Sequence, residues 1–321
     1  MLVEAFLESI EKELSAMVPD EPVGLYSPVH YALGMGGKRM RPILLLLAYS
    51  LYRFDWQRVV PVAIALETYH NHTLLHDDVM DRADVRRGKP SVWRKWDENT
   101  AILSGDVMLI MAISQLTKYN FPHQAEVLNL CLRTMREICE GQQLDMDFER
   151  RNDVSVHEYM EMIRLKTAVL LGCALQSGAM LADAPEAHWS LLYNFGIDLG
   201  LAFQLQDDYL DCYGTADLFG KNIGGDIREG KKTYMLITAY EKATATQREQ
   251  LYKLSQDEVD AEQKVAGVLE IYNQVGIPQV CRAEIERLFN QAQCTLAQLP
   301  IEEKAKETLW KYANSLLHRQ A

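Results

Sequence analysis

Residues 61–81 read PVAIALETYHNHTLLHDDVMD, an apolar segment that ends in a cluster of aspartates. The apolar residues recur at the three- and four-residue spacing that places side chains on one face of a helix. Pro61 is typical of a first helical turn, so the segment predicts a helix that begins near Pro61 and ends at the aspartates. Asp77 and Asp81 are four residues apart and therefore share a helix face, about 6 Å from one another.

A second apolar segment ends in the same way. It begins near Ala184 and closes on residues 202–211, AFQLQDDYLD, where Asp207 and Asp211 again share a face. Like charges at this spacing, at the negative end of the helix dipole, oppose helix formation. One acidic helix end alone is most simply a solvated surface, whereas two that follow apolar core helices indicate carboxylates that bind cations.

The same helical periodicity runs almost from end to end, without internal repeats or low-complexity stretches. Only between about 215 and 234 does the pattern lapse into Gly, Lys and Asp, which predicts a polar loop. We therefore predict an all-α fold in which residues 1–321 form a single domain with its most apolar helices in the interior.

Composition narrows the class of protein. With 33 Lys and Arg against 45 Asp and Glu, the net charge is −12, which excludes general nucleic-acid binding because a phosphate backbone would be repelled. Hydrophobic residues make up 48% of the chain, enough for a large core, so a disordered chain is excluded as well.

Location is predicted from the absence of targeting features. The first ten residues carry acids rather than a basic region, so we expect no signal peptide. The longest apolar run, near residues 43–48, is far shorter than the roughly 20 residues of a membrane span, so we expect no stable membrane insertion. The six scattered cysteines form no C-x-x-C pair and predict buried free thiols in the cytoplasm.

Hard oxygen ligands without cysteine favour Mg²⁺, which completes its coordination with water and substrate phosphate. The two acidic helix ends therefore suggest a clamp for metal-bound phosphates. Basic residues supply the complementary charge: residues 36–42, GGKRMRP, place three cations before a helix N-terminus, a good anion seat. Most lysines only keep a protein surface soluble, but Lys166 has apolar neighbours, which indicates that its side chain is buried and has a functional role.

Together these motifs make the chain resemble the trans-isoprenyl diphosphate synthases, the head-to-tail prenyltransferases that make linear allylic diphosphates. The matching stretches follow the family order over roughly two-thirds of the chain: 37–42 (GKRMRP), 75–81 (LHDDVMD), 86–88 (RRG), 141–142 (GQ), 166–167 (KT), 203–211 (FQLQDDYLD), 220–221 (GK), 225–227 (GDI) and Lys231.

The resemblance implies a helical bundle around a central cavity, usually a homodimer, and a role for each matched residue. It implies that three Mg²⁺ are bound, two by Asp77 and Asp81 and one by Asp207, with Asp211 in the same metal motif. The allylic diphosphate would be contacted by Arg86, Lys166 and Lys231, with Lys221 near it. The diphosphate of isopentenyl diphosphate would be bound by Lys38, Arg41, His70 and Arg87. Thr167 and Gln204 would face the reacting carbons.

Three alternatives stay open. A class I terpene cyclase uses a similar first aspartate motif but has no need for Lys38, Arg41 and Arg87. A head-to-head synthase would also lack the isopentenyl site. A noncatalytic subunit of a heteromeric synthase commonly loses aspartates, and all six are present here.

Product length is predicted from the residues before the first aspartate motif. In the family, bulky side chains four, five or eight positions upstream stop the growing chain, and here these are Thr73, His72 and Tyr69. His72 and Tyr69 favour a short product of farnesyl or geranylgeranyl length over a longer polyprenyl chain.

Overall fold

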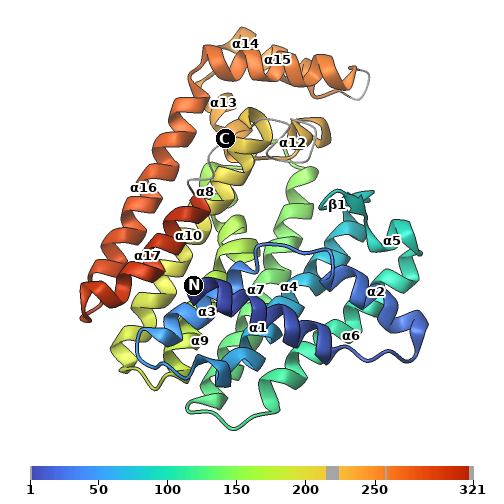
Figure 1. The fold of residues 1–321 in the computed structure, drawn as a ribbon. Coiled ribbons are helices and arrows are strands. Elements are labelled where there is room, and N and C mark those ends of the chain that lie inside the picture. Colours follow the sequence, from blue (N-terminus) through green and yellow to red (C-terminus); the bar gives the residue numbers. More distant parts are fainter. Residues whose placement is uncertain (1, 215–223, 257–258, 318–321) are drawn as a thin grey trace. The chain divides into compact units, whose positions relative to one another are not determined.

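The computed structural model describes residues 2–214, 224–256 and 259–317 (Figure 1). The chain packs into two compact units: unit 1 comprises Met1–Leu132 and Cys173–Tyr193, and unit 2 comprises Arg133–Gly172 and Asn194–Ala321. The predicted all-α class is confirmed, because the described elements are helices apart from one two-stranded hairpin. The single-domain assignment stays a prediction, and each unit is described by itself.

Unit 1 is built from the N-terminal helices and a small hairpin. Its elements are α1 (Leu2–Met17), α2 (Val23–Leu33), α3 (Met40–Ser50), the 3₁₀ helix η1 (Trp56–Val59), α4 (Val60–Met80), β1 (Val85–Arg86), β2 (Lys89–Pro90), α5 (Val92–Lys95) and α6 (Glu98–Thr117). Three longer helices have residues in both units: α7 (Gln124–Glu149), α9 (Val169–Leu181) and α10 (Glu186–Tyr213).

The core of unit 1 forms around α4, which packs against α1, α3 and α6. Buried side chains occur all round α4, and α3 is buried from Ile43 to Tyr49, as expected for apolar interior helices. The predicted start of α4 is confirmed, since Pro61 occupies its first turn, where the missing N–H of proline has no intrahelical partner to lose. The aspartate motif therefore stands at the end of a helix fixed by the core.

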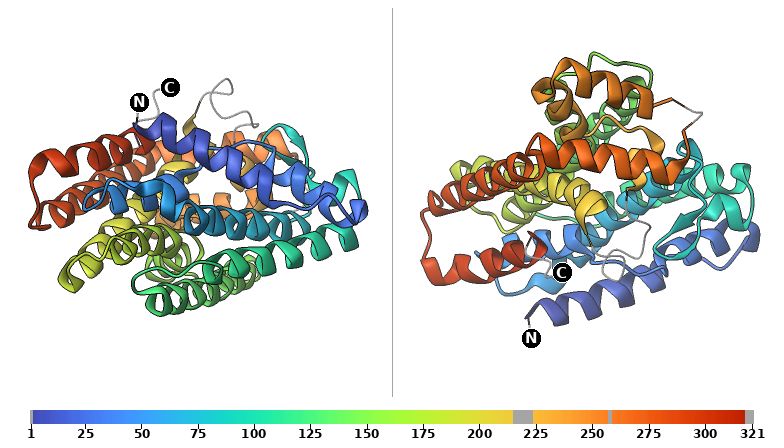
Figure 2. Two further views of the ribbon diagram at one scale, coloured as in Figure 1. Left: turned by 60° about the horizontal axis from the view of Figure 1, so that its bottom comes forward. Right: turned by 90° about the horizontal axis from the view of Figure 1, so that it is seen from above.

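Unit 2 holds the C-terminal helices. Its further elements are α8 (Val156–Ile163), the π-helical turn η2 (Arg164–Ala168), α12 (Gly225–Glu229), α13 (Tyr234–Lys242), α14 (Ala245–Leu254), α15 (Ala261–Gln274), α16 (Ile277–Ala297) and α17 (Glu303–Leu317). Helices α14 and α15 lie side by side in both figures (Figures 1 and 2). Buried Asp198 joins α10 to α16 by accepting hydrogen bonds from Gln291 and Thr295, at 2.9 and 3.1 Å.

Two sequence-based expectations need correction. The predicted polar loop contains the short helix α12, bounded by Gly224 and Gly230 at φ +79° and +71°, angles that glycine adopts without the steric penalty of a side chain. Residues 215–223 lie outside the described part of the chain. All six cysteines are free thiols, but Cys139 and Cys294 are exposed rather than buried because they lie on the solvent faces of their helices.

Helix α6 has an unusual surface. Within the described residues it alone is long and apolar enough to cross a membrane, and 33% of its most apolar window is buried. Its exposed side carries Ile102, Leu103 and Ile110, which are 40%, 59% and 65% exposed. Asp106, whose side chain is 57% exposed, lies between Leu103 and Ile110 on this helix, so the exposed apolar side chains do not form an unbroken face.

Candidate active site

The first aspartate motif divides into a buried anchor and two more accessible carboxylates. Asp78 is only 3% exposed and accepts two hydrogen bonds from Arg86 of β1, from Nε at 2.9 Å and from Nη2 at 2.6 Å. Asp77 is half-buried with Oδ2 3.5 Å from the same guanidinium, and Asp81 is exposed. The hairpin thus brings Arg86, a predicted ligand of the allylic diphosphate, onto the carboxylates predicted to bind metal.

A cationic cluster gathers around His70 on α4. Burial first, and then the charges of Arg41 and Arg87, hold the pKa of His70 well below its usual value. Arg87 donates a hydrogen bond to the carbonyl of Gly36, and its guanidinium lies only 2.9 Å from where a Cβ of Gly37 would be. Three of the four residues predicted to bind isopentenyl diphosphate are therefore close enough to act on one another, and the fourth, Lys38, is exposed in the same loop.

The loop of residues 36–42 differs from the prediction in one respect. Of its three cations, Arg39 is not available as part of an anion seat, because its side chain is fully buried among Glu11, Glu67 and the carbonyl of Leu33. Sequence reasoning could not separate Arg39 from Lys38 and Arg41, since all three are basic and the acids that pair with Arg39 come from distant helices.

The second aspartate motif, in unit 2, also has one buried aspartate and two more accessible ones, but the partners differ. Asp208 is 6% exposed and accepts hydrogen bonds from the Tyr159 hydroxyl and from Gln204 Nε2, the latter at 3.0 Å. Burial raises the pKa of Asp208 to about 6, although both hydrogen bonds favour its charged form. Asp207 and Asp211, the two residues predicted to bind metal, are half-buried.

A further carboxylate joins this motif from α12. The backbone N–H of Asp226 donates to Asp211 Oδ2 at 3.0 Å, so Asp211 caps the short helix as well as belonging to the metal motif. Burial, and after it the charges of Asp208 and Asp211, raise the pKa of Asp226 to about 8. Lys231, a predicted diphosphate ligand, has its Nζ 3.9 Å from Asp226 Oδ1 and 3.0 Å from Glu229 Oε2.

The matched pair Lys166 and Thr167 lies in the π-helical turn η2. Lys166 Nζ is 2.6 Å from Asp145 Oδ2 on α7, and Thr167 donates a hydrogen bond of 3.0 Å to Gln204 Oε1. Such turns often occur at functional sites. A hydrogen-bonded chain therefore runs from Thr167 through Gln204 to buried Asp208.

Two glycines allow the neighbouring helices to approach η2 closely. A Cβ at Gly141 of α7 would lie 2.4 Å from the backbone N of Lys166, and one at Gly200 of α10 would lie 2.6 Å from the Cα of Ala168. The first of these contacts explains Gly141, which belongs to a matched stretch to which the sequence assigned no role. Sequence reasoning also missed Tyr159 and Asp145, for which only their proximity in the fold provides a signal.

Comparisons with known proteins identify the family to which the chain belongs. The family model described as polyprenyl synthetase matches residues 22–272. The chain belongs to the polyprenyl synthetase family. A geranylgeranyl diphosphate synthase of Methanosarcina mazei is 42% identical over 236 residues, which cover 73% of this chain and 72% of the relative. A crystal structure of a geranylgeranyl pyrophosphate synthase is 43% identical with a TM-score of 0.94, and 99% of each chain is covered.

The name of another relative in this family describes one component of an enzyme. A protein of Geobacillus stearothermophilus called heptaprenyl diphosphate synthase component 2 is 36% identical over 233 residues, covering 73% of this chain and 72% of the relative. The similar proteins are isoprenyl diphosphate synthases, so this polyprenyl synthetase family member is a trans-prenyltransferase.

Two of the residues predicted to set product length in this synthase, Tyr69 and His72, belong to a row of neighbouring rings on α4. Tyr69 is 1% exposed, and its ring lies 5.5 Å from that of His72, which in turn lies 4.5 Å from the ring of His76. His72 Nδ1 is 2.9 Å from the carbonyl oxygen of Gly105 on α6, which fixes the imidazole. Thr73 donates its hydroxyl to the carbonyl of His70 at 2.8 Å, so it stays on the backbone of its own helix.

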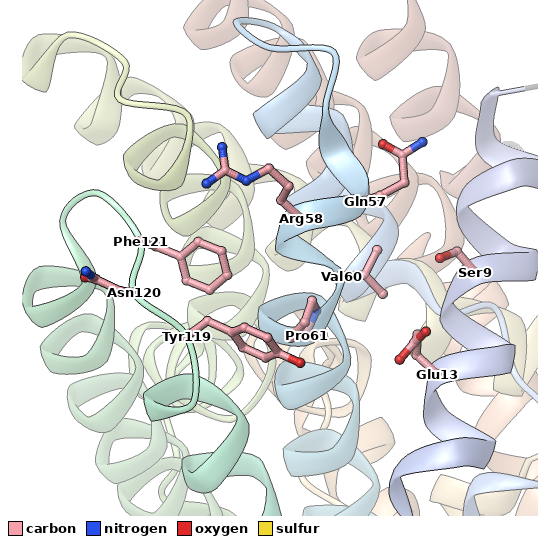
Figure 3. A pocket seen from close by; sticks show the side chains of 9 residues that line it. All are labelled: Ser9, Glu13, Gln57, Arg58, Val60, Pro61, Tyr119, Asn120 and Phe121. Carbon is pink, nitrogen blue, oxygen red and sulfur yellow. The ribbon is translucent and has the colours of Figure 1, made fainter.

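The synthase also has a pocket of about 590 Å³ at the start of α4, away from the aspartates at its end. Figure 3 shows Ser9 and Glu13 of α1 on one side and Tyr119 and Phe121, which follow α6, on the other. No residue that lines this pocket is among those predicted for the active site. The pocket is therefore not the predicted substrate site.

The carboxylates of unit 2 are the type of ligand that a hard divalent cation binds. Burial first, and then the charges of Asp208 and Asp211, raise the pKa of Asp226, so a cation placed beside these carboxylates would favour their charged forms. Across the described residues, no group of three or more His, Cys, Asp or Glu is arranged to hold a metal by itself. A hard cation that completes its coordination with water and substrate phosphate suits such a site, as Mg²⁺ does.

Proposed function

We propose that this synthase condenses isopentenyl diphosphate with an allylic diphosphate, head to tail, and releases a short product of farnesyl or geranylgeranyl length. The observation that carries the proposal is the cationic cluster around His70, where the charges of Arg41 and Arg87 act in addition to that of Arg86, the arginine that pairs with the aspartates. A terpene cyclase, with one diphosphate to bind, has no use for this second set of cations.

The reaction begins when the allylic carbon–oxygen bond breaks and its electron pair leaves with the diphosphate. Asp77, Asp81, Asp207 and Asp211 would hold three Mg²⁺, which supply positive charge for the departing diphosphate. By the resemblance, Arg86, Lys166 and Lys231 would donate hydrogen bonds to the same anion, and Lys221, which is expected near it, lies outside the described residues. Fixed donors of this kind stabilise charge that develops in the transition state without reorganising.

The allylic carbocation then meets polar groups that cannot trap it. The Thr167 hydroxyl donates its hydrogen bond to Gln204, so the lone pairs of the Thr167 oxygen are available to stabilise a neighbouring positive carbon. Gln204 is held in turn by buried Asp208, which fixes the orientation of its amide. The double bond of isopentenyl diphosphate attacks the cation, a carbon–carbon bond forms, and a proton passes to the departed diphosphate.

Lys38, Arg41, His70 and Arg87 would hold the diphosphate of isopentenyl diphosphate throughout. Burial and the neighbouring arginines keep His70 neutral at pH 7, so it would act as a hydrogen-bond donor while the arginines supply the charge. Short product length follows from Tyr69 and His72, whose rings are fixed on α4, and agrees with the geranylgeranyl synthases named above.

We infer that the protein is a homodimer, located in the cytoplasm, with the exposed apolar side chains of α6 at the interface between the copies. Ile102, Leu103 and Ile110 are exposed together on a chain of net charge −12, so a second copy that covers them would remove apolar surface from water. Light scattering at micromolar protein should give twice the mass of one chain.

The decisive assay supplies purified protein with Mg²⁺, isopentenyl diphosphate and, in separate reactions, dimethylallyl, geranyl or farnesyl diphosphate. Release of inorganic diphosphate that requires both substrates, with a longer prenyl product on chromatography, is the expected result. Diphosphate release without isopentenyl diphosphate would indicate a cyclase or a head-to-head synthase, which the products would distinguish. No release with any primer would favour the noncatalytic component of a heteromeric synthase, as the name of the Geobacillus relative suggests.

A further inference from the structure

Arg39 is one of the largest fully buried side chains of the protein and contacts three helices. Its Nε lies 2.7 Å from Glu11 Oε1 on α1, its Nη1 3.0 Å from Glu67 Oε1 on α4, and its Nη2 2.5 Å from the carbonyl oxygen of Leu33 at the end of α2. Arg39 itself precedes the first residue of α3. The guanidinium of Arg39 thus joins three helices at the residue that precedes a fourth.

The backbone at Arg39 is left-handed, a conformation that disfavours side chains. Its φ is +47°, and Gly36 and Gly37 nearby have φ of +80° and +133°. Glycine adopts such angles readily, whereas arginine does so only when its surroundings compensate. The buried contacts of the Arg39 side chain provide that compensation, so the same contacts that bury Arg39 also set the path of the loop.

The neighbours of Arg39 belong to the isopentenyl diphosphate site. Lys38 precedes it and Arg41 follows two residues later, while Glu67 lies three residues before His70 on one face of α4. Glu67 Oε1 also accepts a hydrogen bond of 3.1 Å from Asn71, which fixes this acid from a second side. A change in the Arg39–Glu67 pair would therefore move the chain that carries the predicted anion ligands.

We propose that Arg39 is a positioning residue, which holds the loop of residues 36–41 through Glu11 and Glu67 in the conformation that binds the diphosphate of isopentenyl diphosphate. The proposal rests on the proposed function. Arg39 itself does not contact the substrate. It acts by fixing Lys38 and Arg41 relative to His70.

The rigid fork of arginine is essential to this role. Its five N–H donors reach acceptors on α1, α2 and α4 at once, whereas a lysine ammonium at the end of a flexible stem keeps the charge but cannot satisfy all three directions. Arg39→Lys is therefore the informative variant, because it avoids the uncompensated buried acid that an alanine would leave. Glu67→Gln tests the same contact from its other end.

Arg53 offers a matched control at the other end of α3. Its Nε donates to the carbonyl of Ala182 at 2.8 Å, and the residue lies outside the loop and the aspartate motifs. Wild type, Arg39→Lys, Glu67→Gln and Arg53→Lys are compared at a temperature at which circular dichroism shows every variant folded. The KM for isopentenyl diphosphate, the KM for the allylic substrate and kcat are measured for each.

We expect Arg39→Lys and Glu67→Gln to raise the KM for isopentenyl diphosphate by about tenfold or more, because loss of a charged hydrogen bond has an effect of this size. The kcat and the KM for the allylic substrate should stay within about twofold of the wild-type values. Arg53→Lys should leave all three constants within about twofold. Equal changes in both KM values, or a lower melting temperature with unchanged KM for isopentenyl diphosphate, would overturn the proposal. If Arg39→Lys does not fold, Glu67→Gln decides by the same criteria.

A wild-type protein that does not consume isopentenyl diphosphate in the presence of an allylic primer refutes the proposed function before any variant is compared. An active wild type whose Arg39 and Glu67 variants bind isopentenyl diphosphate normally overturns only the role of Arg39.

Discussion

Replacing Gly141 with alanine should damage catalysis although it adds a good helix former. Gly141 lies in α7, where an alanine in place of glycine ordinarily stabilises a helix by about 1 kcal/mol. Here the new methyl group would meet backbone atoms, the N and Cα of Lys166, at 2.4 and 2.8 Å. Backbone cannot rotate away as a side chain can, so α7 and η2 must separate.

The size of that separation follows from the contact. Ordinary van der Waals contact begins at 3.4 Å, so relief of the 2.4 Å approach requires a shift of about 1 Å. Overpacking of this kind costs about 1–3 kcal/mol, which outweighs or cancels the gain in helix propensity. A 1 Å displacement of a residue that acts on the substrate can lower the rate about 10²-fold. Lys166 and Thr167 are both carried by the displaced turn.

Steady-state release of diphosphate, together with thermal unfolding followed by circular dichroism, tests this expectation. Gly141→Ala should fold, melt at or below the wild-type temperature and lose about 10²-fold in kcat. Gly24→Ala is the control, because a Cβ at Gly24 of α2 would meet nothing within 4 Å, and it should keep full activity. A Gly141→Ala variant with kcat within twofold of wild type would refute the claim that this close approach positions η2.

Three further outcomes are expected. Asp207→Ala should lower turnover by about 10³-fold or more while the melting temperature changes little, because removal of a clustered like charge opens no core; retention of wild-type turnover would contradict the metal role. Burial raises the folded-state pKa of Asp226 from 3.8 to about 8, so its stabilising contribution is complete below pH 4 and lost as pH rises to 8. In the presence of EDTA, the free energy of unfolding of Asp226→Asn should therefore rise relative to that of wild type as the pH increases between those values. Urea unfolding that gives the same difference at every pH would contradict this. Replacing Tyr69 and His72 together with alanine should lengthen the product by at least one isoprene unit on chromatography, and an unchanged product would exclude these rings as the stop.

Helix positions could be predicted from the sequence because they depend on local chemistry. The helix expected to begin near Pro61 begins at Val60, and the one expected near Ala184 begins at Glu186. Apolar periodicity and proline act within a few residues, so distant parts of the chain do not enter. The same is true of the aspartate motifs, whose shared helix faces follow from spacing alone.

The roles of individual charged residues could not be predicted in the same way. Arg39 and Arg41 are two residues apart and identical in type, yet Arg39 is buried by Glu11 and Glu67, which lie 28 residues away on either side. Tyr159 and Asp145 gave no signal because their partners, Asp208 and Lys166, are 49 and 21 residues away. Long-range contacts depend on helix packing, which a single sequence does not reveal.

The middle aspartate of each motif explains why two adjacent acids are present. On a helix, successive side chains point about 100° apart, so a residue next to Asp77 or Asp207 turns away from the face that the first and last aspartates share. Asp78 turns to Arg86, a full positive charge, and Asp208 turns to the neutral donors Tyr159 and Gln204. Asp78 therefore has its charge paired by Arg86, whereas Asp208 is buried against neutral donors, and burial raises the pKa of Asp208 to about 6.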